Sequence, residues 1–149
     1  MGDIVIRINE PDNNITYEDR YSSYAIIKND NEEIAVVEMI GWGYIFPGGK
    51  IEENENSQKT IKRETLEEIG YEVSNLEYYE TFETFYQISS CGRLINCHNI
   101  ADFYLGNMKD KVMEPIEKTN LHWFKPNELY GKLKLDFQNV VLEKIYPKE

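Results

Sequence analysis

The chain has 149 residues, enough for one well-buried core and too few for two ordinary domains. Its formal net charge of −11 argues against a nucleic-acid duplex as the main partner, because such binding depends on lysine and arginine side chains that neutralise phosphates. No apolar run is long enough to span a bilayer, and the amino terminus lacks the basic and apolar stretches of a signal peptide. We therefore expect one soluble cytoplasmic domain over residues 1–149, either a monomer or a homodimer, with no membrane contact.

Three short apolar stretches occupy the first part of the chain. Residues 4–8 alternate weakly between apolar and polar types, which suggests an edge strand. Residues 24–27 and 34–37 are apolar runs separated by the polar stretch 28–33, a pattern typical of a β-hairpin. Because the second run is apolar on both faces, we expect a central strand covered by helices on either side.

An aromatic segment, residues 41–46, leads directly to Gly48 and Gly49. It would place Trp42 or Tyr44 next to whatever the two glycines bind, and either ring is suited to stacking on a nucleobase. Packing within the sheet or across a dimer contact explains these aromatic residues equally well. The expected substrate-binding residues are thus Trp42, Tyr44, Gly48 and Gly49.

Residues 57–69 are predicted to form a helix. Asn56 or Ser57 would cap its first turn with a side-chain oxygen, and Gly70 would end it in the left-handed conformation that glycine adopts most easily. Residues four apart form a narrow stripe that should face the core: Ile61, Thr65 and Ile69.

Three carboxylates, those of Glu64, Glu67 and Glu68, lie beside this stripe on one arc of the helix. Acidic side chains that close repel one another by roughly 0.2–0.5 kcal/mol per pair, and a hard cation removes the repulsion. Mg²⁺ takes oxygen ligands and is often held by a few carboxylates while substrate phosphates complete its shell. Glutamate-rich helices are nevertheless more often solvated faces, so the cluster alone leaves both interpretations open.

The residues around the helix favour the metal interpretation. From Gly49 the chain reads G, five residues, Glu55, seven residues, and then RETLEEIGY over residues 63–71. This resembles the signature of the Nudix hydrolases, G-x5-E-x7-R-E-U-x-E-E-x-G-U, where U is a bulky apolar residue. Every charged and glycine position is filled. Asn54 stands where many relatives have glycine, and asparagine tolerates positive φ better than other side chains.

The resemblance implies an α/β fold, in which a mixed sheet lies between helices as an α/β/α sandwich, over about residues 24–145. It also implies metal ligands at Glu64, Glu67, Glu68 and the carbonyl of Gly48. Glu55 would lie in or just behind this ligand set, and Arg63 would orient the carboxylates by bidentate hydrogen bonds. These five charged residues are the expected catalytic residues, and the expected cofactor is Mg²⁺ or Mn²⁺.

Two longer strands are predicted after the helix, over residues 76–88 and 95–105. The first would place five residues on one face: Leu76, Tyr78, Phe82, Tyr86 and Ile88. Between the strands, Cys91 and Cys97 lie six residues apart. A zinc site needs four ligands, and beyond the neighbouring histidine the chain offers only one more, far away, so we expect reduced thiols.

The charged loop 109–117 precedes a tryptophan-containing strand at 121–124 and a short helix at 126–129. Nudix relatives often have such a loop, which supplies an extra glutamate. Glu114 and Glu117 are therefore candidates, although a solvated loop acid is the better interpretation for either residue taken singly. The last predicted element is a helix at 136–145 with Asp136 as its cap. The residues that it should pack on the sheet are Phe137, Val140, Val141 and Ile145.

The function that the resemblance implies is metal-dependent hydrolysis of the diphosphate bond in a nucleoside diphosphate linked to another group. A nucleoside triphosphate pyrophosphatase, including one that removes oxidised nucleotides, is our first expectation. The alternatives are an ADP-ribose or nucleotide-sugar diphosphatase, a non-catalytic Nudix module that binds a nucleotide to regulate a partner, and an interaction protein that uses the acidic helix as a docking face.

Overall fold

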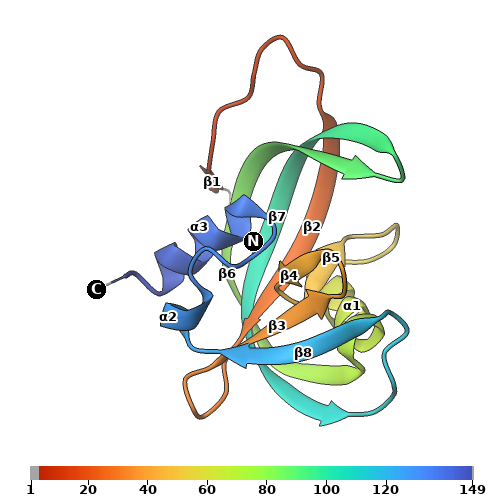
Figure 1. The fold of residues 1–149 in the computed structure, drawn as a ribbon, viewed down its shortest axis with the longest axis vertical. Helices are drawn as coiled ribbons and strands as arrows, with labels where there is room; N and C mark the ends of the chain where they lie inside the picture. Colours follow the sequence, from red (N-terminus) through yellow and green to blue (C-terminus); the bar gives the residue numbers. More distant parts are fainter. Residues whose placement is uncertain (1–3, 149) are drawn as a thin grey trace.

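The computed structural model of the chain describes residues 4–148 (Figure 1). The elements follow one another as β1 (Val5–Arg7), β2 (Glu18–Ile27), β3 (Ile34–Met39), β4 (Gly43–Ile45), β5 (Gly48–Lys50), α1 (Ser57–Ile69), β6 (Tyr71–Ser90), β7 (Arg93–Lys111), β8 (Thr119–Phe124), α2 (Pro126–Leu129) and α3 (Asp136–Ile145). Within the described residues, no helix has the length and apolar composition needed to cross a bilayer.

The strands form two sheets. The larger is mixed, with the order β1-β6-β7-β2-β5, and the smaller is antiparallel, with the order β4-β3-β8. In the larger sheet β6 and β7 form a long antiparallel hairpin, whereas β1 pairs with β6 and β2 with β7 in parallel (Figure 1). The prediction of an edge strand at the amino terminus is confirmed by β1.

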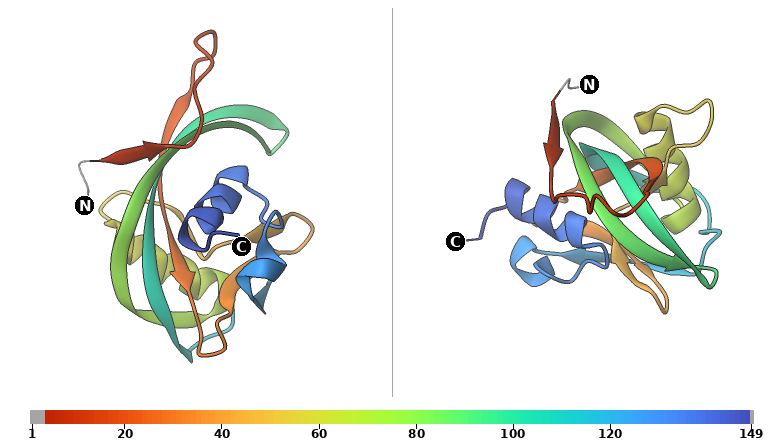
Figure 2. Two further views of the ribbon diagram at one scale, coloured as in Figure 1. Left: turned by 90° about the vertical axis from the view of Figure 1, so that its left-hand side faces the viewer. Right: turned by 90° about the horizontal axis from the view of Figure 1, so that it is seen from above.

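The expected α/β/α layering is confirmed by the way successive side chains of β2 divide between two cores. Tyr24 and Ile26 pack in the cluster that contains α3, whereas Ala25 and Ile27 pack against Ile61 of α1. Side chains alternate between the faces of a strand, so β2 must be covered on both sides. Figure 2 shows α1 and α3 on opposite sides of the long strands.

The predicted hairpin between residues 24–27 and 34–37 is wrong. One antiparallel bridge joins Lys28 to Ile34, and the two strands then enter different sheets. Each already has partners on both edges: β2 lies between β7 and β5, and β3 between β4 and β8. Apart from the Lys28–Ile34 bridge, the two predicted strands do not pair with each other in the described structure, while the prediction of a central strand at β3 is confirmed.

The face predicted for residues 76–88 also needs correction. The register between β6 and β7 shifts at several points, the last between Tyr78 and Glu80. As a result Leu76 packs on the α1 side, whereas Phe82 and Tyr86 pack on the α3 side. A bulge adds one residue to a strand and so reverses the faces that follow it, which strict alternation does not anticipate.

Helix α3 has the predicted bounds but a slightly different buried face. Phe137 and Val141 are buried as expected, whereas Val140 is exposed and Leu142 is buried in its place. At 100° per residue the buried positions span an arc that excludes Val140. Asp136 is the first helical residue rather than the cap, and it makes no capping hydrogen bond.

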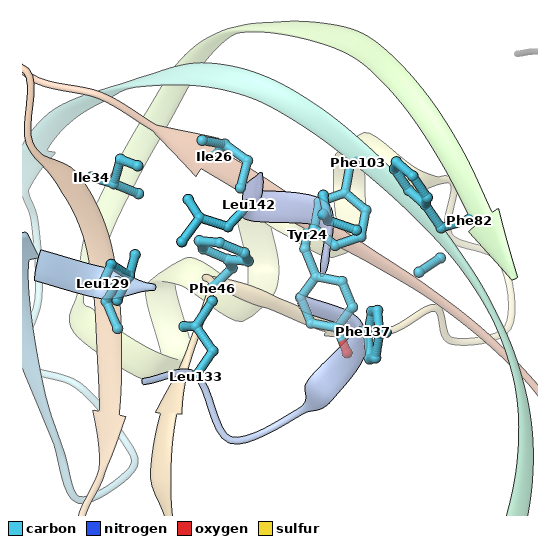
Figure 3. Packing of buried hydrophobic residues seen from close by; sticks show 13 residues of the cluster. Tyr24, Ile26, Ile34, Phe46, Phe82, Phe103, Leu129, Leu133, Phe137 and Leu142 are labelled. Carbon is cyan, nitrogen blue, oxygen red and sulfur yellow. The ribbon is translucent and has the colours of Figure 1, made fainter. Parts of the chain in front are cut away.

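The α3-side core is rich in aromatic rings and fixes the segment that leads to the two glycines (Figure 3). Phe103 lies at its centre, with the ring centroids of Tyr24, Phe46 and Phe82 at 5.5, 6.2 and 5.6 Å. Gln138 of α3 is fully buried, and its Oε1 accepts a hydrogen bond from the backbone N–H of Phe46 at 3.1 Å. The last helix therefore holds the backbone just before the glycine turn.

Candidate functional site

Helix α1 carries the acidic residues and forms as predicted. The side chain of Asn56 accepts a hydrogen bond from the N–H of Lys59 at 2.9 Å, and Gly70 ends the helix with φ of 78°. The predicted stripe is buried, with Ile61, Thr65 and Ile69 all in the interior. These contacts fix the rotation of the helix about its axis, and hence where its glutamates point.

A partly buried polar cluster ties the start of α1 to the large sheet. Ser57 Oγ donates a hydrogen bond to Asp102 Oδ2 at 2.5 Å, and Thr81 Oγ1 donates to Asp102 Oδ1 at 2.6 Å. Ser23 Oγ donates to the carbonyl oxygen of Ser57 at 2.9 Å. Asp102 also places a negative charge near the positive end of the helix dipole. No local sequence pattern indicated this anchor, because it joins three distant strands.

Gly48 and Gly49 form strand β5, which pairs with β2 so that Ser23 lies beside Gly49. Gly48 has φ of 143°, and a β-carbon there would lie 2.1 Å from the carbonyl oxygen of Ser23. A β-carbon at Gly49 would lie 2.0 Å from Glu64 Oε2. The two glycines thus allow the α1 carboxylates to approach the backbone, and Glu68 Oε1 accepts a hydrogen bond from the N–H of Gly48 at 3.2 Å.

Glu64 and Glu68 are carboxylates in an environment that disfavours their negative charge. Glu68 is only 1% exposed, and burial, together with the nearby charge of Glu64, raises its pKa well above the usual range. Burial also raises the pKa of Glu64 to about 7, although Arg63 opposes the shift. Buried carboxylates that lack full compensation favour the binding of a cation.

Arg63 connects the acids of the predicted signature. Its Nε and Nη2 donate to both oxygens of Glu55, at 2.6 and 3.0 Å, in a bidentate pair. Its Nη1 donates to Glu64 at 2.7 Å and to Glu67 at 3.3 Å. The hydrogen bond from Arg63 is the main cause that lowers the pKa of Glu55 to about 2, so this carboxylate stays ionised. Arg63 therefore links Glu55, Glu64 and Glu67 through one guanidinium.

The loop before Glu55 also has the expected geometry. Asn54 has φ of 69°, the left-handed region that asparagine tolerates. Glu55 then accepts hydrogen bonds from the N–H of Glu52 at 3.0 Å and from Thr60 Oγ1 at 2.8 Å. Glu55 is therefore placed against Arg63, behind the α1 acids.

The two loop acids differ in position. The carbonyl of Glu67 accepts hydrogen bonds from the backbone of Ile116 and Glu117, so the loop is held over the end of α1. Burial and the charge of Glu67 raise the pKa of Glu117. The structure thus brings Glu117 to the acidic cluster. Glu114 is exposed and lies beside Lys111 at 3.4 Å, so the structure does not bring it there.

The described residues contain no group of three histidine, cysteine or acidic side chains already arranged to hold a metal ion. The reason is visible in the contacts: Glu64 and Glu67 are drawn to Arg63, whereas Glu68 faces the N–H of Gly48. The donor set is nonetheless all oxygen; Glu68 is buried and Glu64 is partly buried, and neither carboxylate is fully compensated. These properties fit a hard divalent cation such as Mg²⁺ or Mn²⁺.

A cavity of about 280 Å³ opens beside Gly48, Gly49, Glu64 and Glu68, and Trp42 lines it with them. Trp42 is 39% exposed, and Lys134 Nζ lies 5.6 Å from the centre of its ring. The structure therefore places Trp42 where the sequence suggested an aromatic platform.

Tyr44 does not lie in this cavity, so its expected role in substrate binding must be corrected. Its ring packs edge-to-face against His122 and Phe124, with centroids 5.5 and 5.6 Å away. The neighbouring residue Ile45 lines the cavity instead. Successive side chains of β4 point to opposite faces, so Tyr44 and Ile45 cannot both face the site.

Sequence reasoning missed part of the cavity wall, including Arg20, Tyr24 and Tyr86. Arg20 belonged to no predicted element, because the predicted strand began only at residue 24. Strand β2 in fact starts at Glu18. Tyr24 and Ile26 face the same core, and every second side chain of a strand points to the same face. Counting back from Tyr24 two residues at a time would therefore have placed Arg20 on that face.

Residues 19–147 match the model of the NUDIX domain family. The chain belongs to the NUDIX domain family. Among curated proteins it is 47% identical over 38 residues to an 8-oxo-dGTP diphosphatase of Haemophilus influenzae, which covers 26% of this chain and 28% of that protein. An 8-oxo-dGTP diphosphatase of Buchnera aphidicola is 40% identical over 42 residues, or 28% of this chain and 32% of that protein. The matched stretches thus span about a third or less of these relatives.

Solved NUDIX structures share the fold over most of the chain. A MutT NUDIX hydrolase from Burkholderia pseudomallei superimposes with a TM-score of 0.66 at 22% identity, over 86% of this chain and 98% of that one. A UDP-X diphosphatase superimposes with a TM-score of 0.60 at 18% identity, over 89% of this chain and 64% of that one. At these identities the likeness concerns the fold.

Proposed function

We propose that this NUDIX protein is a metal-dependent nucleoside triphosphate pyrophosphatase whose substrates include oxidised nucleotides. The observation that carries the proposal is the position of Glu68, which is buried, and Glu64, which is partly buried, beside Gly48 and Gly49 in the wall of a cavity that Trp42 also lines. Buried acids suit a hard cation, the glycines allow close approach to the backbone, and the aromatic ring suits a base.

Glu64, Glu67, Glu68 and the carbonyl of Gly48 would hold Mg²⁺ or Mn²⁺. A bound divalent ion supplies charge neutralisation on the phosphates and lowers the pKa of bound water. Arg63 holds Glu64 and Glu67 through its Nη1. Glu55 holds the guanidinium from the other side and thereby keeps the acids oriented, while Glu117 adds a further carboxylate near Glu67.

The size of the cavity and the matched relatives support a mononucleotide substrate. At about 280 Å³ the cavity lies just below the usual range for sites of drug-sized ligands, about 300–1,000 Å³, so it suits one nucleoside. The curated proteins with matching stretches are 8-oxo-dGTP diphosphatases. A triphosphate would place its nucleoside in the cavity and its phosphates over the glycine turn.

The test is a substrate panel with Mg²⁺, containing canonical triphosphates, 8-oxo-dGTP, ADP-ribose and diphosphate sugars. Products are separated by chromatography, and heavy-oxygen water identifies the phosphorus that is attacked. We expect release of a nucleoside monophosphate and pyrophosphate from a triphosphate, and a loss of orders of magnitude in Glu68→Gln but not in the exposed control Glu114→Gln.

Two outcomes would overturn this assignment. If ADP-ribose or a nucleotide sugar exceeds every triphosphate tenfold in kcat/KM, the protein is a diphosphatase of that class. If nucleotides bind and none is hydrolysed, the protein is a regulatory binding module.

A further inference from the structure

Arg20 differs from the other arginines of the chain in having no carboxylate partner. The other three each pair with a carboxylate: Arg7 with Glu83 at 2.8 Å, Arg63 with Glu55 at 2.6 Å and Arg93 with Glu18 at 3.1 Å. Within residues 4–148, Arg20 forms no salt bridge, and its Nε is fully buried without a hydrogen-bond partner. Buried donors are nearly always paired in native proteins, so the chain leaves the hydrogen bonds of this guanidinium incomplete even though Tyr24 lies within its reach.

Arg20 lies in the wall of the same cavity as the α1 acids, and among the described residues that line it Arg20 alone carries a positive charge. Its position is set by β2, where Arg20 is on the same face as Tyr24. Tyr24 lies beside Gly48 in the sheet, and Arg20 is four residues farther along, a strand length of about 13 Å. With phosphates at the glycine turn, Arg20 would face the nucleoside.

The surroundings of Arg20 are aromatic and apolar. Burial raises the pKa of Tyr24, Tyr86 and Cys97, and the positive charge of Arg20 opposes the shift in each case, which places the guanidinium close to all three. The ring of Tyr86 stacks on Phe137 with centroids 6.0 Å apart, so its orientation is fixed. A flat wall with one strong donor suits a planar base that carries an acceptor.

On the basis of the function proposed above, we propose that Arg20 determines base specificity by donating a hydrogen bond to the carbonyl oxygen O6 of an oxopurine, guanine or its 8-oxo form. A guanidinium has only donors, and guanine presents O6 as an acceptor. Adenine carries an amino donor at the same position, which would face the donors of Arg20. Guanine and 8-oxoguanine share O6, so the selection does not depend on the oxidised position.

The decisive measurement compares substrates that differ at this atom. The triphosphate of 2-aminopurine deoxyriboside is dGTP without O6, and dITP differs from dATP in having a carbonyl at position 6. In Arg20→Met we expect kcat/KM to fall about 5- to 150-fold for dGTP, 8-oxo-dGTP and dITP, which corresponds to ~1–3 kcal/mol at 1.4 kcal/mol per tenfold. For 2-aminopurine and adenine triphosphates it should change less than about threefold. Arg93→Ala, which removes an exposed arginine, should resemble the wild type.

Binding without metal separates this inference from the proposed activity. Titration calorimetry should show wild-type protein binding dGMP more tightly than dAMP, and Arg20→Met binding both alike. If the wild type hydrolyses no triphosphate, the proposed function fails, and Arg20 is judged from these affinities alone. The melting temperature of Arg20→Met should stay within a few degrees of the wild type, since an arginine without a salt bridge stabilises little.

Equal losses in kcat/KM for the triphosphates of all five bases would show that Arg20 binds phosphate or supports the fold, and would overturn the assignment. An unchanged preference for O6 in Arg20→Met would overturn it as well. A large drop in melting temperature would show a structural role instead.

Discussion

Glu64 occupies space that a side chain at residue 49 would need: its Oε2 lies 2.0 Å from where a β-carbon on Gly49 would be. Gly49 is not among the described glycines that have a positive φ, the backbone conformation that disfavours other residues. The requirement for glycine at residue 49 is therefore steric. It comes from the carboxylate rather than from the backbone.

This relationship predicts a coupling between residues 49 and 64. Gly49→Ala should destabilise the protein by about 1–3 kcal/mol, because the carboxylate or the helix must move. In a Glu64→Ala background the same substitution should cost close to nothing. Urea unfolding of the four proteins in a double-mutant cycle measures the coupling. Additive free energies would show that Gly49 is required for another reason.

Divalent metal should stabilise the native protein, because an ion bound by the folded state relieves the buried charge of Glu64 and Glu68. At a Mg²⁺ concentration 100-fold above Kd, the expected rise in melting temperature is about 5–10 °C for a chain of this size. The rise should be smaller in Glu64→Gln than in the wild type, and in Glu114→Gln, whose exposed side chain pairs with Lys111, it should equal that of the wild type. An equal rise in all three proteins would indicate a non-specific salt effect.

The parts of the site that sequence predicted correctly depend on local geometry. Asn56, Gly70 and Asn54 have their observed conformations because of their own chemistry and that of their neighbours within a few residues. Glu55 and Arg63 are only eight residues apart along the chain, and Arg63 forms bidentate hydrogen bonds of the kind that the resemblance implied.

The parts that sequence missed depend on which strands become neighbours. The anchor at Asp102 joins Ser57 and Thr81, residues far apart along the chain. Whether Arg20 faces the cavity was decided by the register of β2 against β5 and β7. One bulge in β6 was enough to reverse the face of Leu76 relative to Phe82. A single chain carries little local signal for such pairings, since each face change needs only a one-residue shift.

His98 should make stability depend on pH near neutrality. Burial lowers its pKa, but hydrogen bonds to Glu83 at 2.6 Å and Asp19 at 2.9 Å outweigh this effect, and the pKa is raised. The imidazole of His98 also stacks on the ring of Phe85, and Glu83, which it contacts, is paired with Arg7. A raised pKa means that the folded state holds the proton more tightly, so the stabilisation is complete below the unfolded pKa of about 6.5 and is lost as pH rises through the folded value.

The measurement is the difference in unfolding free energy between wild type and His98→Gln, from urea titrations at pH 5 to 9. We expect the wild type to be more stable at pH 5 by on the order of 1 kcal/mol, with the difference shrinking at higher pH. A difference that grows with pH would contradict the prediction.

Trp42 and Tyr44 lie two residues apart, but we expect replacement of Trp42 to affect KM and replacement of Tyr44 to affect stability. Trp42 lines the cavity, so Trp42→Ala should raise KM for the preferred triphosphate by about one to two decades, as expected when ~1–3 kcal/mol of stacking is removed. Tyr44→Ala should leave KM within about twofold, because its ring packs on His122 and Phe124 outside the cavity. It should instead lower the unfolding free energy by about 0.5–1.5 kcal/mol for each of these two ring pairs.

Steady-state kinetics and urea unfolding on the two variants separate the roles. A rise in KM for Tyr44→Ala equal to that for Trp42→Ala would place the base outside this cavity, and an unchanged KM for Trp42→Ala would show that the base does not stack on that ring.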